Sequence, residues 1–422
     1  MNLLHFADLH IGVENYGRID PKRGLHTRTL DVLRSLDYAF EMAIEEETDL
    51  VIFAGDAYKT CNPSPTHQRE FAKKLSLLRK ADIPIVLVPG NHDIPAAFGK
   101  ANSIDIFSAV DLENTHVIRN AKIEIIDTPS GQIQVAGLPW PNRNILRTRD
   151  DFRNETQETL KATIEKYCHE IISEKFVPQL KPEIPSILVA HVDTAGAVFS
   201  GKTTTSMVGE DPKILLSSLA NKAFDYVALG HIHKHQNLNK DGRPPVVYSG
   251  SMQYVDFGEE LDTKGFCIVE ISESKQEENY RTTTFEFVPL DEALHFVTID
   301  VHLSSEDGDL TDQILRAIGK SEIEGAIVRL LYTIPEGSTD RVHLERVRAA
   351  LERAEYVAYV RPHPTKTEIT RKDAINPDLS LREALGKYID SNDSLVRQKN
   401  ELLRLANELE KELADEKNSE TS

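Results

Sequence analysis

Short aliphatic runs in this sequence stop abruptly at polar side chains, and the clearest of them covers residues 83–88. It ends at Pro89-Gly90-Asn91-His92-Asp93, a pattern typical of a buried strand that stops at a tight turn. Gly90 lets the backbone turn sharply and lets another group approach it closely. The three polar side chains that follow offer a carbonyl oxygen, an imidazole and a carboxylate, which can bind metal ions or transfer protons. Taken alone, the segment is as consistent with an ordinary strand-to-loop turn as with a site.

The same pattern recurs elsewhere in the chain. Residues 3–7 lead to Asp8 and His10, residues 50–54 to Asp56, residues 187–190 to His191, and residues 226–229 to His231 and His233. In layered α/β folds, ligands gather at the carboxyl ends of the strands. Because so many independent coincidences are improbable, the sequence predicts that these side chains meet in a metal site.

Helical and strand patterns alternate between these runs. An amphipathic helix is predicted over about residues 29–47, a basic-faced helix within residues 63–80, and a long helix over about residues 152–175. Further strands are predicted at residues 117–126 and 132–138, joined by a turn at residues 129–131, and at residues 246–248. The alternation indicates an α/β fold.

The 422 residues are enough for about two or three domains. We expect a first domain over residues 1–290. From about residue 296, strands at 297–301, 326–333 and 356–360 alternate with helices near 310–318 and 342–354, which predicts a small βαβαβ-like domain over residues 296–365.

The last segment, residues 366–422, is highly charged. Leucines and a tyrosine recur in it at helical spacing: Leu381, Leu385, Tyr388, Leu395, Leu402, Leu405, Leu409 and Leu413. Two short amphipathic helices cannot bury this apolar stripe by themselves. Docking on the chain's own body and docking in the groove of a partner are equally consistent with the pattern.

Charge and cysteine content narrow the class of protein. The formal charge of −19 argues against a generally basic nucleic-acid coat protein, although a local basic groove stays open. The three cysteines are far apart and form no CxxC motif, which fits a reducing cytoplasm. The first residues have no basic segment typical of a signal peptide, and no apolar run approaches the roughly 20 residues of a membrane span.

The candidate ligands are too many for one catalytic ion with an open position. They are the seven residues Asp8, His10, Asp56, Asn91, His191, His231 and His233. The set suits two ions about 3.5–4 Å apart that share a carboxylate, an arrangement that can neutralise a phosphoryl oxygen. Nitrogen and oxygen ligands without thiolate favour Mn²⁺, Fe²⁺ or Zn²⁺ over Ca²⁺ or Cu⁺, and Mg²⁺ stays open. The implied reaction is phosphoester hydrolysis, with His92 as the group that protonates the leaving oxygen or stabilises the transition state.

In this order the motifs DxH, GD, GNHD, a lone His and GHxH resemble the calcineurin-like metallophosphoesterase superfamily. The flanking residues Ala7 to Gly12, Pro63-Ser64-Pro65, Tyr248 to Ser251 and Val255 to Glu259 make the sequence similar to its branch of DNA-repair nucleases. The resemblance implies a two-sheet α/β/β/α sandwich with a small α+β capping domain and a C-terminal helical region that binds a partner. It covers at least residues 1–290 and extends in layout to the rest of the chain.

The resemblance also implies roles for individual residues. One ion would take Asp8, His10, Asp56 and His233, and the other Asp56, Asn91, His191 and His231. Members of this branch are Mn²⁺-dependent exonucleases and endonucleases that act on DNA ends and hairpins in double-strand-break repair and recombination. They form homodimers and bind an SMC-like ABC ATPase through C-terminal helices.

One residue departs from the family pattern. The position three residues after the bridging aspartate usually holds an Asp or His that orients the catalytic histidine, and here it is Lys59. An ammonium group cannot accept a hydrogen bond from His92. Either another group orients His92 or Lys59 contacts phosphate.

Three functions are consistent with the sequence: a nuclease that acts on DNA, a phosphatase or phosphodiesterase that acts on other phosphoesters, and a subunit that mainly tethers DNA ends. A basic DNA path is a further hypothesis, with candidate residues Lys73, Lys74, Arg143, Arg147, Arg149 and Arg153. Among these, Arg143 is the expected substrate contact beside Lys59.

Overall fold

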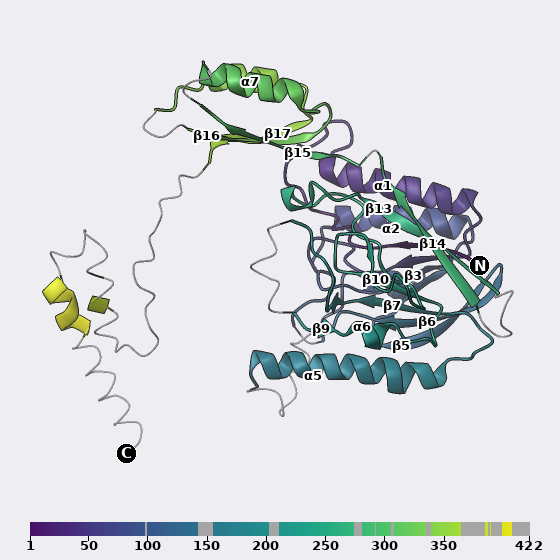
Figure 1. Ribbon diagram of the computed structural model, residues 1–422. Coiled ribbons are helices and arrows are strands. Elements are labelled where there is room, and N and C mark those ends of the chain that lie inside the picture. The colour runs from purple at the N-terminus through teal and green to yellow at the C-terminus, as the bar shows by residue number, and fades with distance from the viewer. Residues whose placement is uncertain are drawn as a thin grey trace. The chain divides into compact units, whose positions relative to one another are not determined.

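The computed structural model describes residues 1–97, 99–141, 155–201, 211–273, 281–291, 293–304, 308–334 and 339–363, and residues 385–386, 389 and 399–406 nearer the C-terminus (Figure 1). The chain divides into two compact units, Met1–Arg361 and Pro362–Ser422. None of the helices in these described ranges is long and apolar enough to cross a membrane.

The first unit contains two large mixed sheets. In the first, the strand order is β14 (Arg281–Pro289), β13 (Gly265–Glu273), β1 (Asn2–Phe6), β2 (Leu50–Phe53), β3 (Ile85–Leu87) and β4 (Thr115–Val117). In the second, the order is β11 (Gln236–Asn237), β12 (Val246–Tyr248), β10 (Tyr226–Gly230), β7 (Ser186–His191), β6 (Gly131–Leu138) and β5 (Lys122–Thr128). In the first sheet β1, β2, β3 and β4 run parallel to one another, as do β12, β10, β7 and β6 in the second, so within each sheet their carboxyl ends lie at one edge.

Helices cover the outer face of each sheet. Helices α1 (Thr27–Glu45) and α2 (Pro65–Lys80) lie together on one side, and α5 (Gln157–Glu170) lies on the opposite side (Figure 1). One apolar cluster joins α1 and α2 to the first sheet, another joins α5 to the second sheet, and a third fills the space between the sheets. The result is the predicted α/β/β/α sandwich. Parallel strands buried on both faces explain why their sequences read as unbroken aliphatic runs.

Shorter elements complete this part of the chain. They are α3 (Asp105–Ala109), β8 (Asp193–Thr194), β9 (Lys213–Ile214), α6 (Leu216–Leu219), and the 3₁₀ turns η3 (Val177–Gln179) and η5 (Phe257–Glu259). Helix α5 continues directly into a π-helical turn, η2 (Ile171–Phe176). The predicted helix over residues 152–175 therefore covers both elements, and its first residues lie outside the described ranges.

The strand predicted over residues 117–126 is wrong in one respect, because two strands occupy this region. Strand β4 ends at Val117 in the first sheet, and β5 begins at Lys122 in the second sheet. Ile118 lies between them and is fully buried in the cluster between the sheets. The apolar Ile118 continues the pattern of β4, so only the polar pair Arg119-Asn120 marks the break between the two strands in the sequence.

A three-stranded sheet with its own apolar cluster follows the second sheet in the chain. Its strands are β15 (Phe296–His302), β16 (Ile327–Thr333) and β17 (Tyr356–Pro362), and the helices α7 (Leu310–Lys320) and α8 (Leu344–Ala350) alternate with them. Side chains of both helices and of β15 and β16 form the cluster, among them Ile314, Val328 and Val347. The element order is the one expected from the sequence. Most of the leucine-rich segment beyond it lies outside the described residues.

Burial of His5 on β1 generates a testable prediction. Its side chain is fully buried, and its Nδ1 atom lies 3.0 Å from the Tyr226 hydroxyl. Burial, with a smaller contribution from His235, lowers the pKa of His5 from 6.5 to about 3. Between pH 6.5 and about pH 3, His5 is therefore protonated in the unfolded chain but neutral in the folded chain. Stability is lost as the pH falls through this range.

We expect His5→Phe to remove this pH-dependent contribution, which amounts to about 2 kcal/mol between about pH 7.5 and pH 5. Urea denaturation of both proteins at the two pH values measures it. The variant should lose about that much less stability on acidification than the wild type. Equal losses in the two proteins would show that His5 does not contribute.

Candidate metal centre

All the ligands predicted from the sequence meet where the carboxyl ends of the parallel strands converge. Asp8 and His10 follow β1, Asp56 follows β2, Asn91 follows β3, His191 ends β7, and His231 and His233 follow β10. The first three strands belong to one sheet and the last two to the other, so the site lies at an edge that both sheets share. Sets of these groups place their ligand atoms within 4.8 Å of one another.

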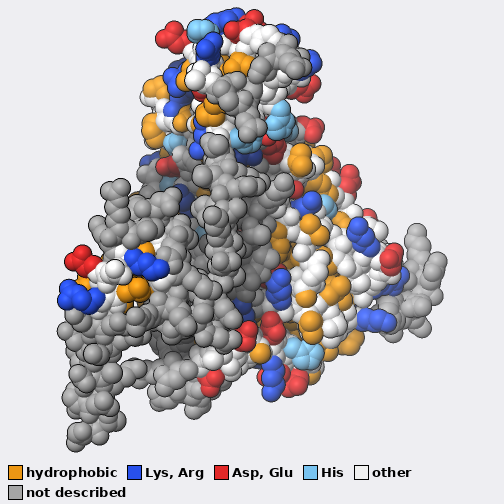
Figure 2. Space-filling model, turned by 60° about the vertical axis from the view of Figure 1, so that its left-hand side comes forward, with side chains coloured by type: hydrophobic (Ala, Val, Ile, Leu, Met, Phe, Trp, Pro, Cys, Tyr) orange, Lys and Arg blue, Asp and Glu red, His pale blue; other side chains and the backbone are white. Residues whose placement is uncertain are grey.

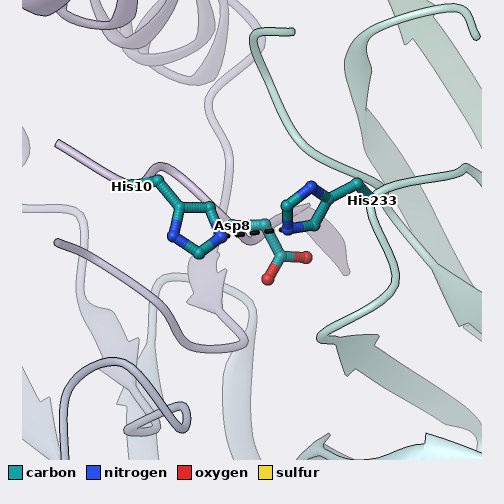
Figure 3. A group of neighbouring side chains, drawn as sticks. All are labelled: Asp8, His10 and His233. Carbon is teal, nitrogen blue, oxygen red and sulfur yellow. Dashed lines mark hydrogen bonds between the residues drawn. The ribbon is translucent and has the colours of Figure 1, made fainter. Parts of the chain in front are cut away.

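One group consists of Asp8, His10 and His233 (Figure 3). The Nε2 atoms of the two imidazoles point at each other across 2.9 Å, and the Asp8 carboxylate lies beside them (Figure 3). The backbone N–H of His231 donates to both Asp8 oxygens at 3.1 Å, which fixes the carboxylate. Two imidazole lone pairs and a carboxylate aimed at one point are the donors that a borderline divalent cation accepts.

A second group forms around Asn91. Its Oδ1 atom lies 3.0 Å from Nε2 of His191 and 3.1 Å from Nδ1 of His231. His191 is fully buried and donates from Nδ1 to the carbonyl of Ala54 at 2.7 Å, which leaves Nε2 to face the site. A histidine oriented in this way through its other nitrogen is the usual arrangement of a metal ligand.

Asp56 stands between the two groups. Its Oδ2 atom is 3.4 Å from Nε2 of His191 and 3.7 Å from Nε2 of His10, while its Oδ1 atom accepts a hydrogen bond from the backbone of His92 at 2.8 Å. Burial disfavours the charged carboxylate, but the neighbouring imidazoles outweigh it and hold the pKa of Asp56 below its ordinary value. A carboxylate placed between two sets of donors could serve two adjacent cations.

The pKa values of the other ligands follow from burial and from Asp56. Burial raises the pKa of Asp8 and lowers that of His10, and it lowers the pKa of His231 to about 3. For His191, burial is outweighed by the Asp56 carboxylate, which raises the pKa to about 9. A proton on His191 and a cation at Nε2 are alternatives for the same position, so binding of a cation would release this proton.

Two glycines make the close packing of the site feasible. A Cβ atom on Gly90 would lie 2.1 Å from Oδ1 of Asp56, and a Cβ atom on Gly55 would lie 2.3 Å from Nδ1 of His191. Gly55 also has φ of +101°, a conformation that side-chain-bearing residues seldom adopt. Asp8, His10 and Asp56 themselves have positive φ values of 54°, 46° and 62°. Such strain persists only where surrounding contacts determine the conformation.

Asp93 provides several of those contacts. It is fully buried, and its carboxylate accepts backbone hydrogen bonds from Asp56 at 2.8 Å, Ala57 at 3.1 Å and Gly90 at 3.0 Å, and one from the Ser103 hydroxyl at 2.9 Å. Burial raises its pKa to about 6. Asp93 therefore joins the loops that follow β2 and β3.

The backbone of Lys59, the residue that departs from the family pattern, holds His92. Its Nδ1 atom lies 2.8 Å from the carbonyl oxygen of Lys59, to which it donates. This contact leaves Nε2 as the second polar atom of an exposed ring, and the ring packs edge-on against His10 with centroids 4.8 Å apart. Of the two alternatives open from the sequence, the structure supplies an orienting group other than the Lys59 side chain.

Three residues near the site carry no role in the sequence analysis. Glu259 approaches His233, with Oε1 2.6 Å from Nδ1, and the fully buried Lys264 lies 2.7 Å from the other Glu259 oxygen. Trp140, the only tryptophan in the chain, stacks at a tilt on His231 with ring centroids 4.8 Å apart. Glu259 lies in the segment that carries the family resemblance, so the sequence contains a reason to single it out. No such sequence signal marks Lys264 or Trp140.

The hypothetical basic path is only partly described. Lys73 is paired with Glu70 at 2.9 Å and Lys74 with Asp37, so both cations on α2 have acidic partners. Arg143 and the three arginines that follow it lie outside the described residues. On the described part of the face drawn in Figure 2, basic, acidic and hydrophobic side chains are intermixed.

The fold and the site agree with a known family. Residues 1–235, more than half of the 422-residue chain, match the family described as calcineurin-like phosphoesterase. The chain therefore belongs to the calcineurin-like phosphoesterases.

Comparison with individual proteins identifies more specific similarities within this family. The chain is 26% identical over 296 residues to SbcD, the D component of the SbcCD nuclease, of Staphylococcus saprophyticus, covering 69% of each chain. It is 25% identical over 383 residues to the DNA double-strand break repair protein Mre11 of Archaeoglobus fulgidus, covering 84% of this chain and 73% of that protein. A solved dimetal phosphatase from Danio rerio matches 64% of this chain and 92% of its own at 11% identity and a TM-score of 0.35. The resemblance to an SbcD-like nuclease thus has support in two sequence relatives.

The contacts of Asp93 lead to a prediction about the site. In an Asp93→Ala variant, the backbone donors of Asp56, Ala57 and Gly90 lose their acceptor, and we expect a stability loss of about 2–4 kcal/mol. Metal affinity should fall by about 10–100-fold because the loop that carries Asp56 loses its support. Urea denaturation and calorimetric Mn²⁺ titration measure the two effects.

Two variants serve as controls for this prediction. Ser103→Ala removes one of the hydrogen bonds to Asp93 and should cost only about 1 kcal/mol. Asp127→Asn alters an exposed carboxylate that pairs with Gln132 and should change neither quantity. Wild-type metal affinity in Asp93→Ala would contradict the supporting role.

Proposed function

We propose that this protein is a two-metal-dependent DNA nuclease that hydrolyses phosphodiester bonds, as an exonuclease on duplex ends and as an endonuclease on hairpins or single strands. The observation that carries the proposal is the position of Asp56 between two sets of nitrogen and oxygen donors. The similarity to SbcD and to Mre11 supports DNA as the substrate.

The donors fit two divalent cations, with Mn²⁺ as the first choice and Mg²⁺, Fe²⁺ or Zn²⁺ as alternatives. Asp8, His10, Asp56 and His233 would hold one, and Asp56, Asn91, His191 and His231 the other. When bound, the pair would stabilise charge on a phosphodiester oxygen and supply a nucleophile at neutral pH.

His92 has the properties of the proton donor for the leaving oxygen. The Lys59 carbonyl fixes its Nδ1 atom at 2.8 Å, which leaves Nε2 for the substrate. The ring is exposed, whereas Asp8, His10, Asp56 and His191 are buried, so a DNA strand can reach His92 without displacing a ligand.

The remaining parts of the chain fit the architecture of such a nuclease. We propose that residues 296–365 act as a capping domain beside the nuclease domain of residues 1–290. We further propose that the protein is a homodimer and binds an SbcC-type ATPase through the helices of residues 366–422. The name of the staphylococcal relative, a component of SbcCD, supports a partner of this kind.

A His92→Gln variant tests the proposed chemistry. Glutamine cannot transfer a proton, so we expect the cleavage rate to fall by about 10²–10⁴-fold. Mn²⁺ affinity should stay within about twofold, because His92 is not among the proposed ligands. End-labelled duplex and hairpin DNA, cut with and without the ATPase partner, give the rate, and calorimetry gives the affinity.

Lys59→Met is the matched control, since it keeps the backbone carbonyl that orients His92. Its kcat should stay close to that of the wild type, and any effect should appear in KM. Normal cleavage by His92→Gln would disprove the role of His92. Strong hydrolysis of an aryl phosphodiester without any cleavage of DNA would replace the nuclease by a phosphodiesterase for other substrates.

A truncation tests the proposed partner site. Removing the residues after about Lys372 deletes the leucine-rich segment and leaves the described sandwich and three-stranded sheet intact. We expect loss of ATPase binding in a pull-down or in size-exclusion chromatography, together with metal-dependent cleavage at the full-length rate. A truncated chain that still bound the ATPase would place the partner site elsewhere.

A further inference from the structure

The turn η5 (Phe257–Glu259) and the residues around it lie between the metal centre and the three-stranded sheet. Glu259 faces the metal centre, and its side chain is only 7% exposed. Its Oε1 atom accepts from Nδ1 of His233 at 2.6 Å, and its Oε2 atom accepts from the backbone of Val255 at 2.9 Å. The second contact fixes the carboxylate, so the direction of the His233 ring is determined by a rigid group.

Lys264 holds this carboxylate in place from its other side. Its side chain is fully buried, and Nζ lies 2.7 Å from Oε2 of Glu259 and 3.8 Å from Oδ2 of Asp262. It also donates to the Ser251 hydroxyl at 2.9 Å and to the His233 carbonyl at 3.4 Å. With Nδ1 directed at Glu259, the His233 ring turns its Nε2 atom towards His10, 2.9 Å from the Nε2 atom of that ring.

The three-stranded sheet holds the same turn from the other side. The Glu260 carboxylate accepts from the backbone of Thr298 on β15 at 2.6 Å. Phe257 packs edge-on against Phe296 with centroids 4.8 Å apart, and the Arg329 guanidinium of β16 lies 4.5 Å from the centre of the Phe257 ring. Residues 257 and 260 are thus fixed by β15 and β16, while residue 259 between them holds the histidine.

We propose that Glu259 is a positioning residue for His233 and that the three-stranded sheet, through η5, sets the affinity of the metal position formed by Asp8, His10 and His233. A displacement of β15 or β16 moves Phe257 and Glu260, and Glu259 moves with them because it directly adjoins Glu260 in the chain. The other metal position, around Asn91 and His191, forms no hydrogen bond, ion pair or ring contact with this turn among the described residues. The inference rests on the proposed two-metal site and adds to it a connection between the sheet and one of the two positions.

Metal titration of the full-length protein without DNA tests the role of Glu259. Calorimetry with Mn²⁺ should resolve two binding steps in the wild type. In Glu259→Leu one step should weaken by about 10–100-fold while the other stays within about twofold. Glu259→Gln keeps an oxygen that accepts from Nδ1 and should restore most of the lost affinity.

A double variant separates a loss of stability from a loss of metal affinity. Glu259→Leu leaves the buried Lys264 without its nearest partner, whereas the double variant Glu259→Leu/Lys264→Met removes both charges together. The double variant should keep the wild-type unfolding midpoint and still show one weakened step. Two wild-type steps in the double variant, or an equal loss in both steps, would overturn the positioning role.

A second pair of variants tests the connection to the sheet. Glu260→Ala removes the contact with Thr298 without altering a group that touches His233, and it should weaken the same step by several-fold. Glu355→Ala removes the exposed ion pair between Arg18 and Glu355, which also joins the three-stranded sheet's region to the sandwich but avoids η5, and it should change neither step. Equal behaviour of these two variants would overturn the connection. Because none of these measurements uses DNA, they stand even if DNA proves not to be the substrate.

Discussion

The buried carboxylate of Asp56 is the group on which the arrangement of the site depends. One of its oxygens faces His10 and His191 from the two sheets, and the other accepts from the backbone of the His92 loop. Two like-charged carboxylates, Asp8 and Asp56, lie in the same buried cluster and oppose each other's ionisation. The imidazoles offset part of this repulsion in the chain itself, and divalent cations would offset it more fully.

Backbone hydrogen bonds to a second buried carboxylate, that of Asp93, hold the loop that carries Asp56. Asp93 collects backbone N–H groups from Asp56, Ala57 and Gly90 on one carboxylate, so the turns after β2 and β3 form one unit. This bracing allows Asp8, His10 and Asp56 to keep positive φ angles that would each cost free energy in an isolated chain. The positions of the candidate ligands therefore depend on a buried group that is not itself one of them.

The sequence was sufficient to predict most of the strands, the sandwich class and the seven candidate ligands that the structure brings together, because parallel strands bring their carboxyl ends to one edge and leave polar residues there. It was insufficient for contacts made by the backbone. The Lys59 carbonyl that orients His92 has no signature in side-chain identity, and the change from β4 to β5 is marked only by the polar pair Arg119-Asn120 after the buried Ile118. Glu259 and Lys264 meet His233 only through tertiary packing, and their spacing in the chain predicts no such contact.

The segment Asn91-His92-Asp93 illustrates how one strand end can serve three purposes. Successive side chains leave the turn after β3 in different directions: Asn91 towards His191 and His231, His92 towards solvent, and Asp93 into the protein interior. Burial separates their chemistry, because the interior position raises the pKa of Asp93 to about 6 whereas His92 stays accessible to a substrate. A candidate ligand, a proposed proton donor and a structural acceptor can therefore occupy adjacent residues because Gly90 admits the backbone next to Asp56, where a Cβ atom would lie 2.1 Å from the carboxylate. The glycine before these residues is thus as necessary to the site as the side chains that perform its chemistry.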